Sequence, residues 1–221
     1  MNGDTLPIQH GIYGTKGVAS ALNSPGGRMA GIATWTDTTG YLWLFGGLGM
    51  DEASLMASNL NDLWRYDPNP LSPTFNQWTW MSGTKIIDQK GHYGTKGIPG
   101  INNYPGGRMK TSCTWVDKGG DLWLFGGTGK DSVNNGQFTP MGYLNDLWRY
   151  NISTNTWTWE NGDPLINQNG IYLTMGTSNP NCKPGGRVIY TSWTDINGNF
   201  WLYGGTGLDG VSGTPADLND M

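Results

Sequence analysis

The sequence predicts an all-β protein in which one structural unit recurs about three times. Its 221 residues include 36 Gly, 12 Pro and 12 Trp, and only 14% of them are charged. Frequent turn-forming residues divide the chain into short segments, whereas the many large aromatic side chains require a packed interior and argue against disorder. The strongest observation is a repeat with a period of about 80 residues, because self-similarity of this kind determines the whole architecture.

Three motifs recur at this spacing. The tetrapeptide P-G-G-R occurs at 25–28, 105–108 and 184–187. The hexapeptide L-W-L-F-G-G occurs at 42–47 and 122–127, and F-W-L-Y-G-G takes its place at 200–205. The heptapeptide L-N-D-L-W-R-Y occurs at 60–66 and 144–150. Because the spacings of different motifs agree, the repeat extends over the full length of the chain.

Each unit is predicted to contain four short strands separated by turns. In the first unit the strands cover 29–36, 41–45, 60–66 and 77–81. Each is a run of aromatic and branched residues bounded by Gly, Pro, Asn or Asp, which is typical of β-strands. The stretch 37–40 ends in Gly, as a tight turn prefers at its last position. Four consecutive strands predict one small antiparallel sheet per unit.

A recurring set of residues marks these strands. The second strand ends on a Gly-Gly doublet, the third carries Tyr66 or its counterpart, and the fourth carries Trp78 or Trp157. Together with the Arg that opens the first strand, this pattern resembles the kelch repeat over nearly the whole chain. The resemblance implies a kelch-type β-propeller with four-stranded antiparallel blades. It implies structural roles for Gly46, Gly47, Gly126, Gly127, Gly204, Gly205, Trp78 and Trp157.

The repeat divides the chain into units 1–80, 81–159 and 160–221 of one propeller domain, the third of them truncated. This amounts to about two and a half blades, fewer than the roughly 4–8 blades of a closed propeller. An open sheet edge favours aggregation, so further blades are expected. They come either from the same longer chain or from self-association of several copies.

Antiparallel connectivity places the long loops on one face, here called the loop face, at which the first strand of each unit starts. Binding sites usually lie in long loops on a rigid scaffold. The loops between the second and third strands vary between units, and they supply the ligand candidates Met50, Asp51, Glu52, Lys130, Asp131, Phe138, Tyr143 and Asp209. The inter-unit segments 1–27, 82–107 and 160–186 repeat, which favours a structural cover that packs blade against blade.

Arg28, Arg108 and Arg187 open the first strands and would line the upper central channel. Their guanidinium groups could bind an anionic ligand. We favour a structural role, in which each Arg bonds backbone carbonyls of the neighbouring blade, because a ring of cations in a narrow channel must be compensated. Asp62 and Asp146 are expected to accept backbone N–H groups within their blades.

These observations favour a non-catalytic binding or interaction module whose ligand is a protein or a glycan. The sequence lacks G-x-S-x-G, His-Glu-x-x-His and paired C-x-x-C motifs, and it offers no close histidine pair for copper. Two alternatives stay open. One is a fragment of a carbohydrate-active or galactose-oxidase-like enzyme whose catalytic residues lie outside this segment, and the other is a structural subunit of a surface assembly.

The composition excludes several other classes. The 13 Lys and Arg residues are scattered, which argues against nucleic-acid binding. No apolar run approaches the roughly 20 residues of a membrane-spanning helix, so no membrane insertion is expected. No cofactor is expected, and calcium is considered only at the oxygen-rich turn 195–199. Few Lys and abundant Asn, Thr, Gly and Trp favour an extracellular or cell-surface location, whereas Cys113 and Cys182 do not determine the redox compartment.

Overall fold

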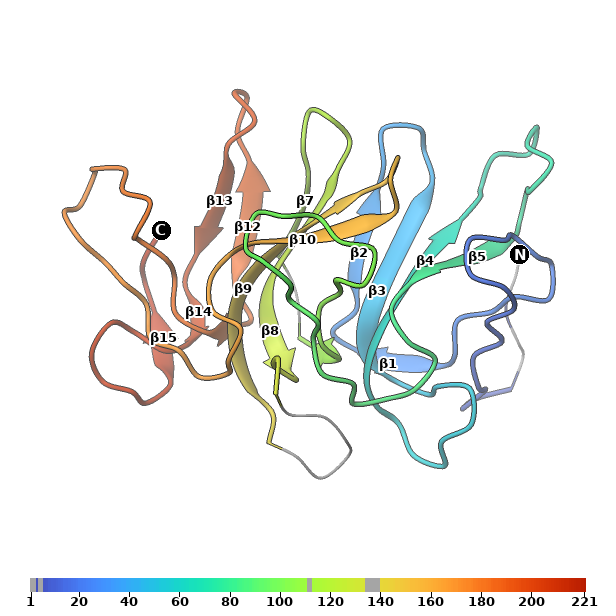
Figure 1. The fold of residues 1–221 in the computed structure, drawn as a ribbon, viewed down its shortest axis with the longest axis horizontal. Helices are drawn as coiled ribbons and strands as arrows, with labels where there is room; N and C mark the ends of the chain where they lie inside the picture. The colour runs from blue at the N-terminus through green and yellow to red at the C-terminus, as the bar shows by residue number, and fades with distance from the viewer. Residues whose placement is uncertain (1–2, 4–5, 111–112, 134–139) are drawn as a thin grey trace.

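All regular secondary structure in the described part of the chain is β-strand (Figure 1). The structure is a computed structural model that describes residues 3, 6–110, 113–133 and 140–221. All paired strands are antiparallel, so the predicted all-β class is confirmed. None of the described segments forms a helix long and apolar enough to span a membrane.

The first unit forms one antiparallel sheet from five strand segments. They are β1 (Arg28–Ala30), β2 (Ala33–Thr36), β3 (Leu42–Gly49), β4 (Ser58–Tyr66) and β5 (Trp78–Ser82). Both β1 and β2 pair with β3, and β4 and β5 follow in order on its other side. The first predicted strand is therefore present as two pieces, and the sheet is four strands wide.

The second unit repeats this arrangement. Its segments are β6 (Arg108–Met109), β7 (Cys113–Val116), β8 (Leu122–Gly129), β9 (Gly142–Asn151) and β10 (Thr156–Asn161). Both β6 and β7 pair with β8, and β9 and β10 complete the sheet. Equivalent residues face each other between β2 and β3 and between β7 and β8, and again between β3 and β4 and between β8 and β9, so the sequence period is also a period of the strand register.

The third unit contains counterparts of the first three strands. They are β11 (Arg187–Val188), β12 (Thr191–Thr194), β13 (Phe200–Tyr203), β14 (Gly205–Gly207) and β15 (Ala216–Leu218). Strands β11, β14 and β15 form one sheet, and β12 and β13 form a two-stranded sheet. In the described part of the chain, none of the sheets closes on itself.

The Gly-Gly doublets introduce an irregularity into the ladders. Between Phe45 and Gly47 the register of β3 against β4 shifts, and Gly46 and Gly47 have φ values of 62° and 94°. A side chain on Gly46 would place its Cβ 2.9 Å from the carbonyl oxygen of Leu60, so this position accepts only glycine. The other two doublets also have positive φ angles, and they comprise Gly126, Gly127, Gly204 and Gly205.

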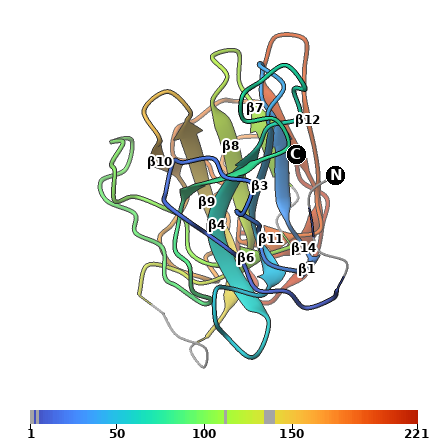
Figure 2. The same cartoon turned by 90° about the vertical axis from the view of Figure 1, so that its right-hand side faces the viewer.

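The sheets of the three units lie side by side, with β7 in contact with both β2 and β12 (Figures 1 and 2). Indole N–H groups link neighbouring sheets. Trp35 of the first sheet donates to the carbonyl oxygen of Trp123 at 3.0 Å, and Trp115 of the second donates to that of Trp193 at 3.1 Å. Strands of consecutive units are therefore joined by side-chain to backbone hydrogen bonds.

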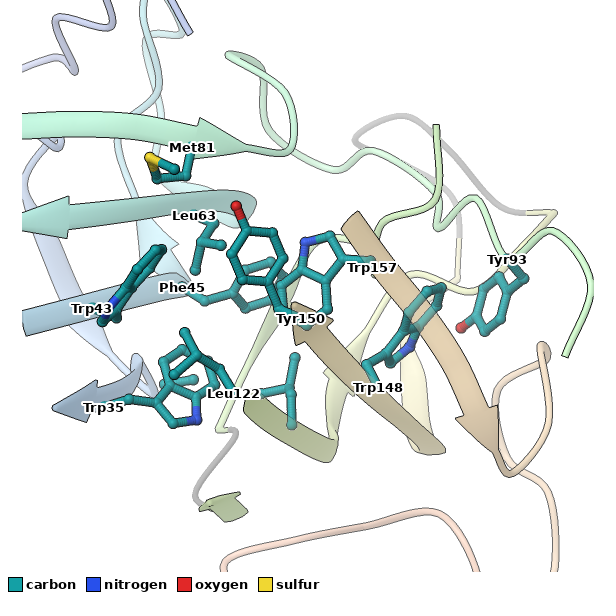
Figure 3. Close-up of a cluster of buried hydrophobic side chains, with 12 residues drawn as sticks. Trp35, Trp43, Phe45, Leu63, Met81, Tyr93, Leu122, Trp148, Tyr150 and Trp157 are labelled. Carbon is teal, nitrogen blue, oxygen red and sulfur yellow. The ribbon is translucent and has the colours of Figure 1, made fainter. Parts of the chain in front are cut away.

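Most of the hydrophobic core lies between adjacent sheets. Between the first two sheets, Trp35, Trp43 and Phe45 pack in one cluster with Leu122, Tyr150 and Trp157 (Figure 3). Between the second and third sheets, the cluster comprises Cys113, Trp115, Phe125 and Tyr190, with Phe200 and Leu202 packed against it. Trp35 and Trp115 are 6% and 7% exposed, whereas their counterpart Trp193 is 42% exposed, because the structure describes no sheet beyond it. The first two units thus bury Trp35 and Trp115 against the unit that follows.

Loop lengths differ between the two ends of the sheets. At the lower end in Figure 1 lie the connections 50–57 and 208–215 and the described residues between β8 and β9. At the upper end lie the hairpin turns 37–40, 117–120 and 195–198 and the connection 67–77. The variable loops between the second and third strands therefore share one end, as predicted for the loop face, although the connection 67–77 at the other end is longer than 50–57.

The middle of the segments 1–27 and 82–107 packs on the sheet of its own unit, whereas the two ends of 82–107 contact the preceding unit, as expected for a cover between units. Gly17 donates its N–H to the carbonyl oxygen of Trp80 at 2.8 Å, and Gly97 donates to that of Trp159 at 2.8 Å. The Tyr13 ring lies edge-on to Trp80, 5.3 Å between centroids. These bonds occupy backbone groups on the outer strand, which would otherwise form an open edge.

Candidate functional site

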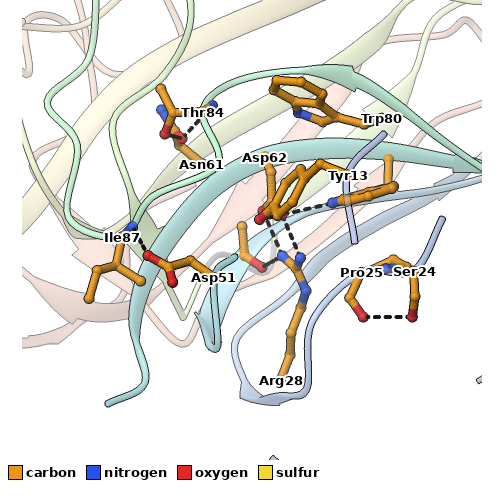
Figure 4. Close-up of polar contacts among 12 residues, drawn as sticks. Tyr13, Ser24, Pro25, Arg28, Asp51, Asn61, Asp62, Trp80, Thr84 and Ile87 are labelled. Carbon is orange, nitrogen blue, oxygen red and sulfur yellow. Dashed lines mark hydrogen bonds and ion pairs between the residues drawn. The ribbon is translucent and has the colours of Figure 1, made fainter. Parts of the chain in front are cut away.

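A buried ionic cluster joins β1 to β4 in the first unit (Figure 4). Arg28 donates to both carboxylate oxygens of Asp62, at 2.7 and 2.5 Å, and to the carbonyl oxygen of Gly46 at 2.9 Å. The Tyr13 hydroxyl and the Trp64 indole also donate to Asp62, at 2.8 and 2.7 Å. We call this arrangement the Arg–Asp–Tyr–Trp cluster.

The second unit contains the same cluster with the same partners. Arg108 donates to both oxygens of Asp146 at 2.7 Å and to the carbonyl oxygen of Gly126 at 3.1 Å. Tyr93 and Trp148 each donate to Asp146 at 2.7 Å. The side chains of Arg108 and Asp146 are fully buried, so the ion pair is desolvated and its geometry is set by the fold.

The third unit contains a more exposed version. Arg187 donates to the two oxygens of Asp220 at 2.6 and 2.7 Å, and to the carbonyl oxygen of Gly204 at 3.1 Å. Tyr172 donates to Asp220, as its counterparts do in the other units. Arg187 is buried, whereas Tyr172 is exposed and Asp220 is partly exposed.

The charges in these clusters are compensated internally. Burial alone would lower the pKa of Arg108, but the Asp146 carboxylate outweighs it and raises that pKa above its ordinary value. Burial and the same carboxylate raise the pKa of Tyr93 well above its ordinary value. Arg108 also donates its Nε–H to Gly106. The N–H groups of Arg108 thus bind acceptors of its own unit, and the expectation that they bind carbonyl oxygens of the neighbouring unit was wrong. The expectation that Asp146 accepts backbone N–H groups was also wrong, because its hydrogen-bond donors are side chains.

The loop candidate Asp51 is bound within its own loop and to the next inter-unit segment. It accepts the N–H groups of Ala53, Ser54 and Ile87 at 2.9, 2.6 and 2.9 Å, and the Ser54 hydroxyl at 2.7 Å. Burial would raise the pKa of Asp51, but these hydrogen bonds outweigh it and lower the pKa. The carboxylate therefore anchors the loop.

The other two loop carboxylates occupy the same position after the Gly-Gly doublet. Asp131 accepts the N–H groups of Val133 and Ile166 at 3.0 and 3.2 Å. Asp209 accepts the N–H of Val211 at 2.7 Å. All three candidate Asp residues thus hold the start of a loop in place by the same kind of turn, which Asp side chains favour.

The remaining loop candidates lie in different environments. Met50 and Lys130 are buried, and Glu52 is exposed. Tyr143 is half-buried at the start of β9, where its carbonyl oxygen contacts the segment that leads into the third unit. Phe138 lies outside the described residues. The structure therefore does not gather the candidates into one pocket.

Sequence reasoning missed a set of exposed aliphatic side chains on the loop face. Leu55, Val133 and Val211 come from the corresponding loops of the three units, and all three are largely exposed. The signal was present in the sequence as apolar residues within otherwise polar variable loops. Beside the first loop lies a pocket of about 660 Å³, which Leu55, Met56 and Ile8 help to line.

The turn considered for calcium is a hairpin whose carboxylate accepts several hydrogen bonds. Asp195 accepts the N–H groups of Asn197 and Asn199 at 2.9 and 2.8 Å and the Trp201 indole N–H at 3.0 Å. Hydrogen bonds, those from Asn199 foremost, lower its pKa to about 2. Asp37 binds its own hairpin in the same way. Residues 3, 6–110, 113–133 and 140–221 contain no group of three or more His, Cys, Asp or Glu that could hold a metal.

The two cysteines differ in their surroundings. Cys113 is buried in the cluster between the second and third sheets, and burial raises the pKa of its thiol to about 12. Cys182 is half-buried, and neither cysteine forms a disulfide with another described residue.

Comparison with known proteins gives no assignment. No protein-family model matches this chain, and no curated protein matches it.

Proposed function

We propose that the chain is a segment of a kelch-type β-propeller and acts as a non-catalytic binding module. Three features support the propeller: four antiparallel strands in each of the first two units, side-by-side packing of consecutive sheets, and recurrence of the Gly-Gly doublet and the Trp residues in register. The rigid sheets then serve as a scaffold, and the variable loops carry the binding function.

The ligand in this proposal is a protein rather than a glycan. The observation that carries it is a contrast between repeated and variable residues. The repeated carboxylates and guanidinium groups are engaged within the fold, whereas the variable loops present the aliphatic side chains of Leu55, Val133 and Val211. Exposed aliphatic groups on loops suit the apolar centre of a protein interface. Glycan recognition would instead favour exposed aromatic rings and unoccupied polar groups.

A displayed library of random peptides and a glycan array test this proposal directly. The wild-type protein is expected to enrich a set of peptides and to show no selective glycan binding. Val133→Ser together with Val211→Ser is expected to weaken peptide binding about tenfold or more, the usual effect of losing central apolar contacts. Leu71→Ser with Ile196→Ser is the matched control, because these two exposed aliphatic residues lie at the opposite end.

Three results would count against the proposal. They are selective glycan binding without peptide enrichment, equal losses in the two double variants, and peptide binding that neither double variant changes. Circular dichroism of each variant confirms that the sheets are retained.

A further inference from the structure

The junction between the first and second units has a specific hydrogen-bond pattern. Asp88 donates its N–H to the carbonyl oxygen of Asn59 at 2.7 Å, and the Asn61 side chain donates to the carbonyl oxygen of Pro105 at 3.2 Å. Gly107 lies so close that a Cβ would be 2.8 Å from the Asn59 carbonyl oxygen. The start of β4 therefore fits against the segment that leads into the next unit.

The junction between the second and third units repeats this pattern at equivalent positions. Asn167 donates its N–H to the carbonyl oxygen of Tyr143 at 2.7 Å, and the Asn145 side chain donates to the carbonyl oxygen of Pro184 at 3.1 Å. A Cβ on Gly186 would be 2.6 Å from the Tyr143 carbonyl oxygen. Each unit thus takes part in junctions through two sides. The receiving side lies in its inter-unit segment and consists of a backbone N–H, a Pro carbonyl oxygen and a Gly. The inserting side is the start of its third strand.

No segment among the described residues occupies the receiving side of the first unit. The counterparts of Asp88, Pro105 and Gly107 are Ile8, Pro25 and Gly27. All three line the pocket of about 660 Å³. Ile8 is exposed, and the Pro25 carbonyl oxygen accepts only the Ser24 hydroxyl from the described residues (Figure 4).

The backbone around this pocket already has the conformation of a formed junction. Ile8 has a φ of 58°, and its counterparts Asp88 and Asn167 have φ values of 56° and 58°. A branched side chain rarely adopts this region, so the repeat and not the local side chain determines the conformation. The Ile8 N–H group therefore has the same orientation as the hydrogen-bonded N–H groups of Asp88 and Asn167. It has no hydrogen-bond acceptor among the described residues.

The inserting side of the third unit is exposed in the part of the chain that the structure describes. Asp217 and Asn219 are the counterparts of Asn59 and Asn61, and both are exposed. Trp193, exposed at the same side of the molecule, corresponds to Trp35 and Trp115, which are covered by the following unit. The structure therefore carries the two halves of one junction at its opposite ends (Figure 1).

We propose that this chain associates head to tail with a second copy of itself, whose segment 217–219 enters the pocket beside Ile8. The Asp217 carbonyl oxygen accepts the Ile8 N–H, and the Asn219 side chain donates to the Pro25 carbonyl oxygen. The exposed Trp193 ring of the inserting copy lies over Leu42 of the receiving copy, as Trp35 lies over Leu122. Contacts of this kind close into rings or continue as chains of subunits.

This inference continues an interface that occurs twice within the molecule, and it does not depend on the loop ligand. Two copies bring together six units, within the range of about 4–8 sheets in closed propellers. A peptide-binding test at Val133 and Val211 and an association test at Gly27 and Asn219 address different surfaces. Failure of one proposal is therefore distinguishable from failure of the other.

Gly27 offers a substitution that a single copy tolerates and the junction does not. In one copy the nearest atoms to a Cβ on Gly27 would belong to Gln9 and Ile8, at 3.5 Å or more, which is an ordinary contact. At the equivalent Gly107 and Gly186 the same atom would be 2.8 and 2.6 Å from a carbonyl oxygen of the preceding unit. Gly27→Leu is therefore expected to block the receiving side.

Asn219→Asp changes the inserting side without changing its shape. It replaces an amide donor by a carboxylate that would face the Pro25 carbonyl oxygen, while the exposed Asn219 has no hydrogen-bond partner to lose among the described residues of one copy. Asn181→Asp is the matched control, because Asn181 is also exposed and lies away from the junction positions.

Sedimentation velocity over a concentration series, with light scattering on the eluted peak, measures the association. The wild type is expected to reach the mass of two or more 24.1 kDa chains. Gly27→Leu and Asn219→Asp are each expected to weaken association about tenfold or more, as loss of a buried hydrogen bond or a steric clash would. Asn181→Asp is expected to behave as the wild type.

Mixing the two disrupted variants tests the direction of the contact. The Gly27→Leu copy keeps its inserting side and the Asn219→Asp copy keeps its receiving side, so the mixture is expected to form pairs that neither variant forms alone. A monomeric wild type at all concentrations overturns the proposal. So does association that both substitutions leave unchanged, or a mixture that stays monomeric. Circular dichroism and tryptophan emission verify that each variant is folded.

Discussion

Removal of the Asp146 carboxylate is expected to be among the most destabilising single changes in this protein. Asp146 is fully buried and accepts four hydrogen bonds from described residues, two from Arg108 and one each from Tyr93 and Trp148, at 2.7 Å. Asp146→Ala leaves the Arg108 charge buried without its partner, which costs about 3–5 kcal/mol. Tyr93→Phe removes one bond and keeps the ion pair, so its cost is about 1.5–3 kcal/mol.

Urea-induced unfolding followed by tryptophan fluorescence gives the free energy of unfolding for each variant. Glu52→Gln is the control, because it breaks the exposed ion pair with Lys85 at 3.2 Å and is expected to cost less than about 1 kcal/mol. A double variant with Arg108→Met and Asp146→Leu is expected to recover much of the loss, since no buried charge is then unpaired. If Asp146→Ala cost no more than Glu52→Gln, the cluster would not stabilise the unit and the reasoning would be refuted.

Two further predictions concern titratable groups. The pKa of Asp195 is lowered to about 2 by the hairpin hydrogen bonds, so this carboxylate contributes stability that is complete above its unfolded value and is lost as pH falls through the folded value. Between about pH 4 and pH 2 the thermal midpoint is expected to fall more steeply in the wild type than in Asp195→Asn, and parallel curves would contradict this. Cys113, whose thiol pKa is raised to about 12 by burial, is expected to react with an aromatic disulfide reagent only after unfolding, whereas the half-buried Cys182 reacts in the folded protein. Absorbance of the released thiolate in Cys182→Ser checks this, and rapid reaction of the native variant would disprove it.

The order of the strands could be predicted from the sequence because their signals are local. The turn that begins at Asp37 and the doublet at Gly46 mark strand ends by backbone conformation alone, and the repeat confirms each assignment in a second copy. The sequence also predicted that Trp35 needs a neighbouring unit for its burial, because one small sheet cannot bury an indole on each of its faces. The gap between β1 and β2 could not be predicted from the sequence, because Gly31 is the one turn-forming residue that marks it.

The candidate site was harder to predict because its contacts join distant parts of the chain. The pairing of Arg28 with Asp62 spans 34 positions and depends on how β1 and β4 are brought to the same end of the sheet. Asp51 was selected for lying in a variable loop, although an Asp at the same offset in all three loops already indicated a structural role. The exposed aliphatic residues Val133 and Val211 were not selected, because apolar side chains in loops are usually assigned to packing.

Every member of an Arg–Asp–Tyr–Trp cluster comes from a single unit, whereas each junction combines main-chain atoms and one Asn with aromatic side chains packed between the sheets. Each unit consequently contains the polar contacts that stabilise its own sheet, and the same junction contacts join it to the next unit. Both sets of contacts lie outside the loop residues that vary between units, so those residues can change without removing either set.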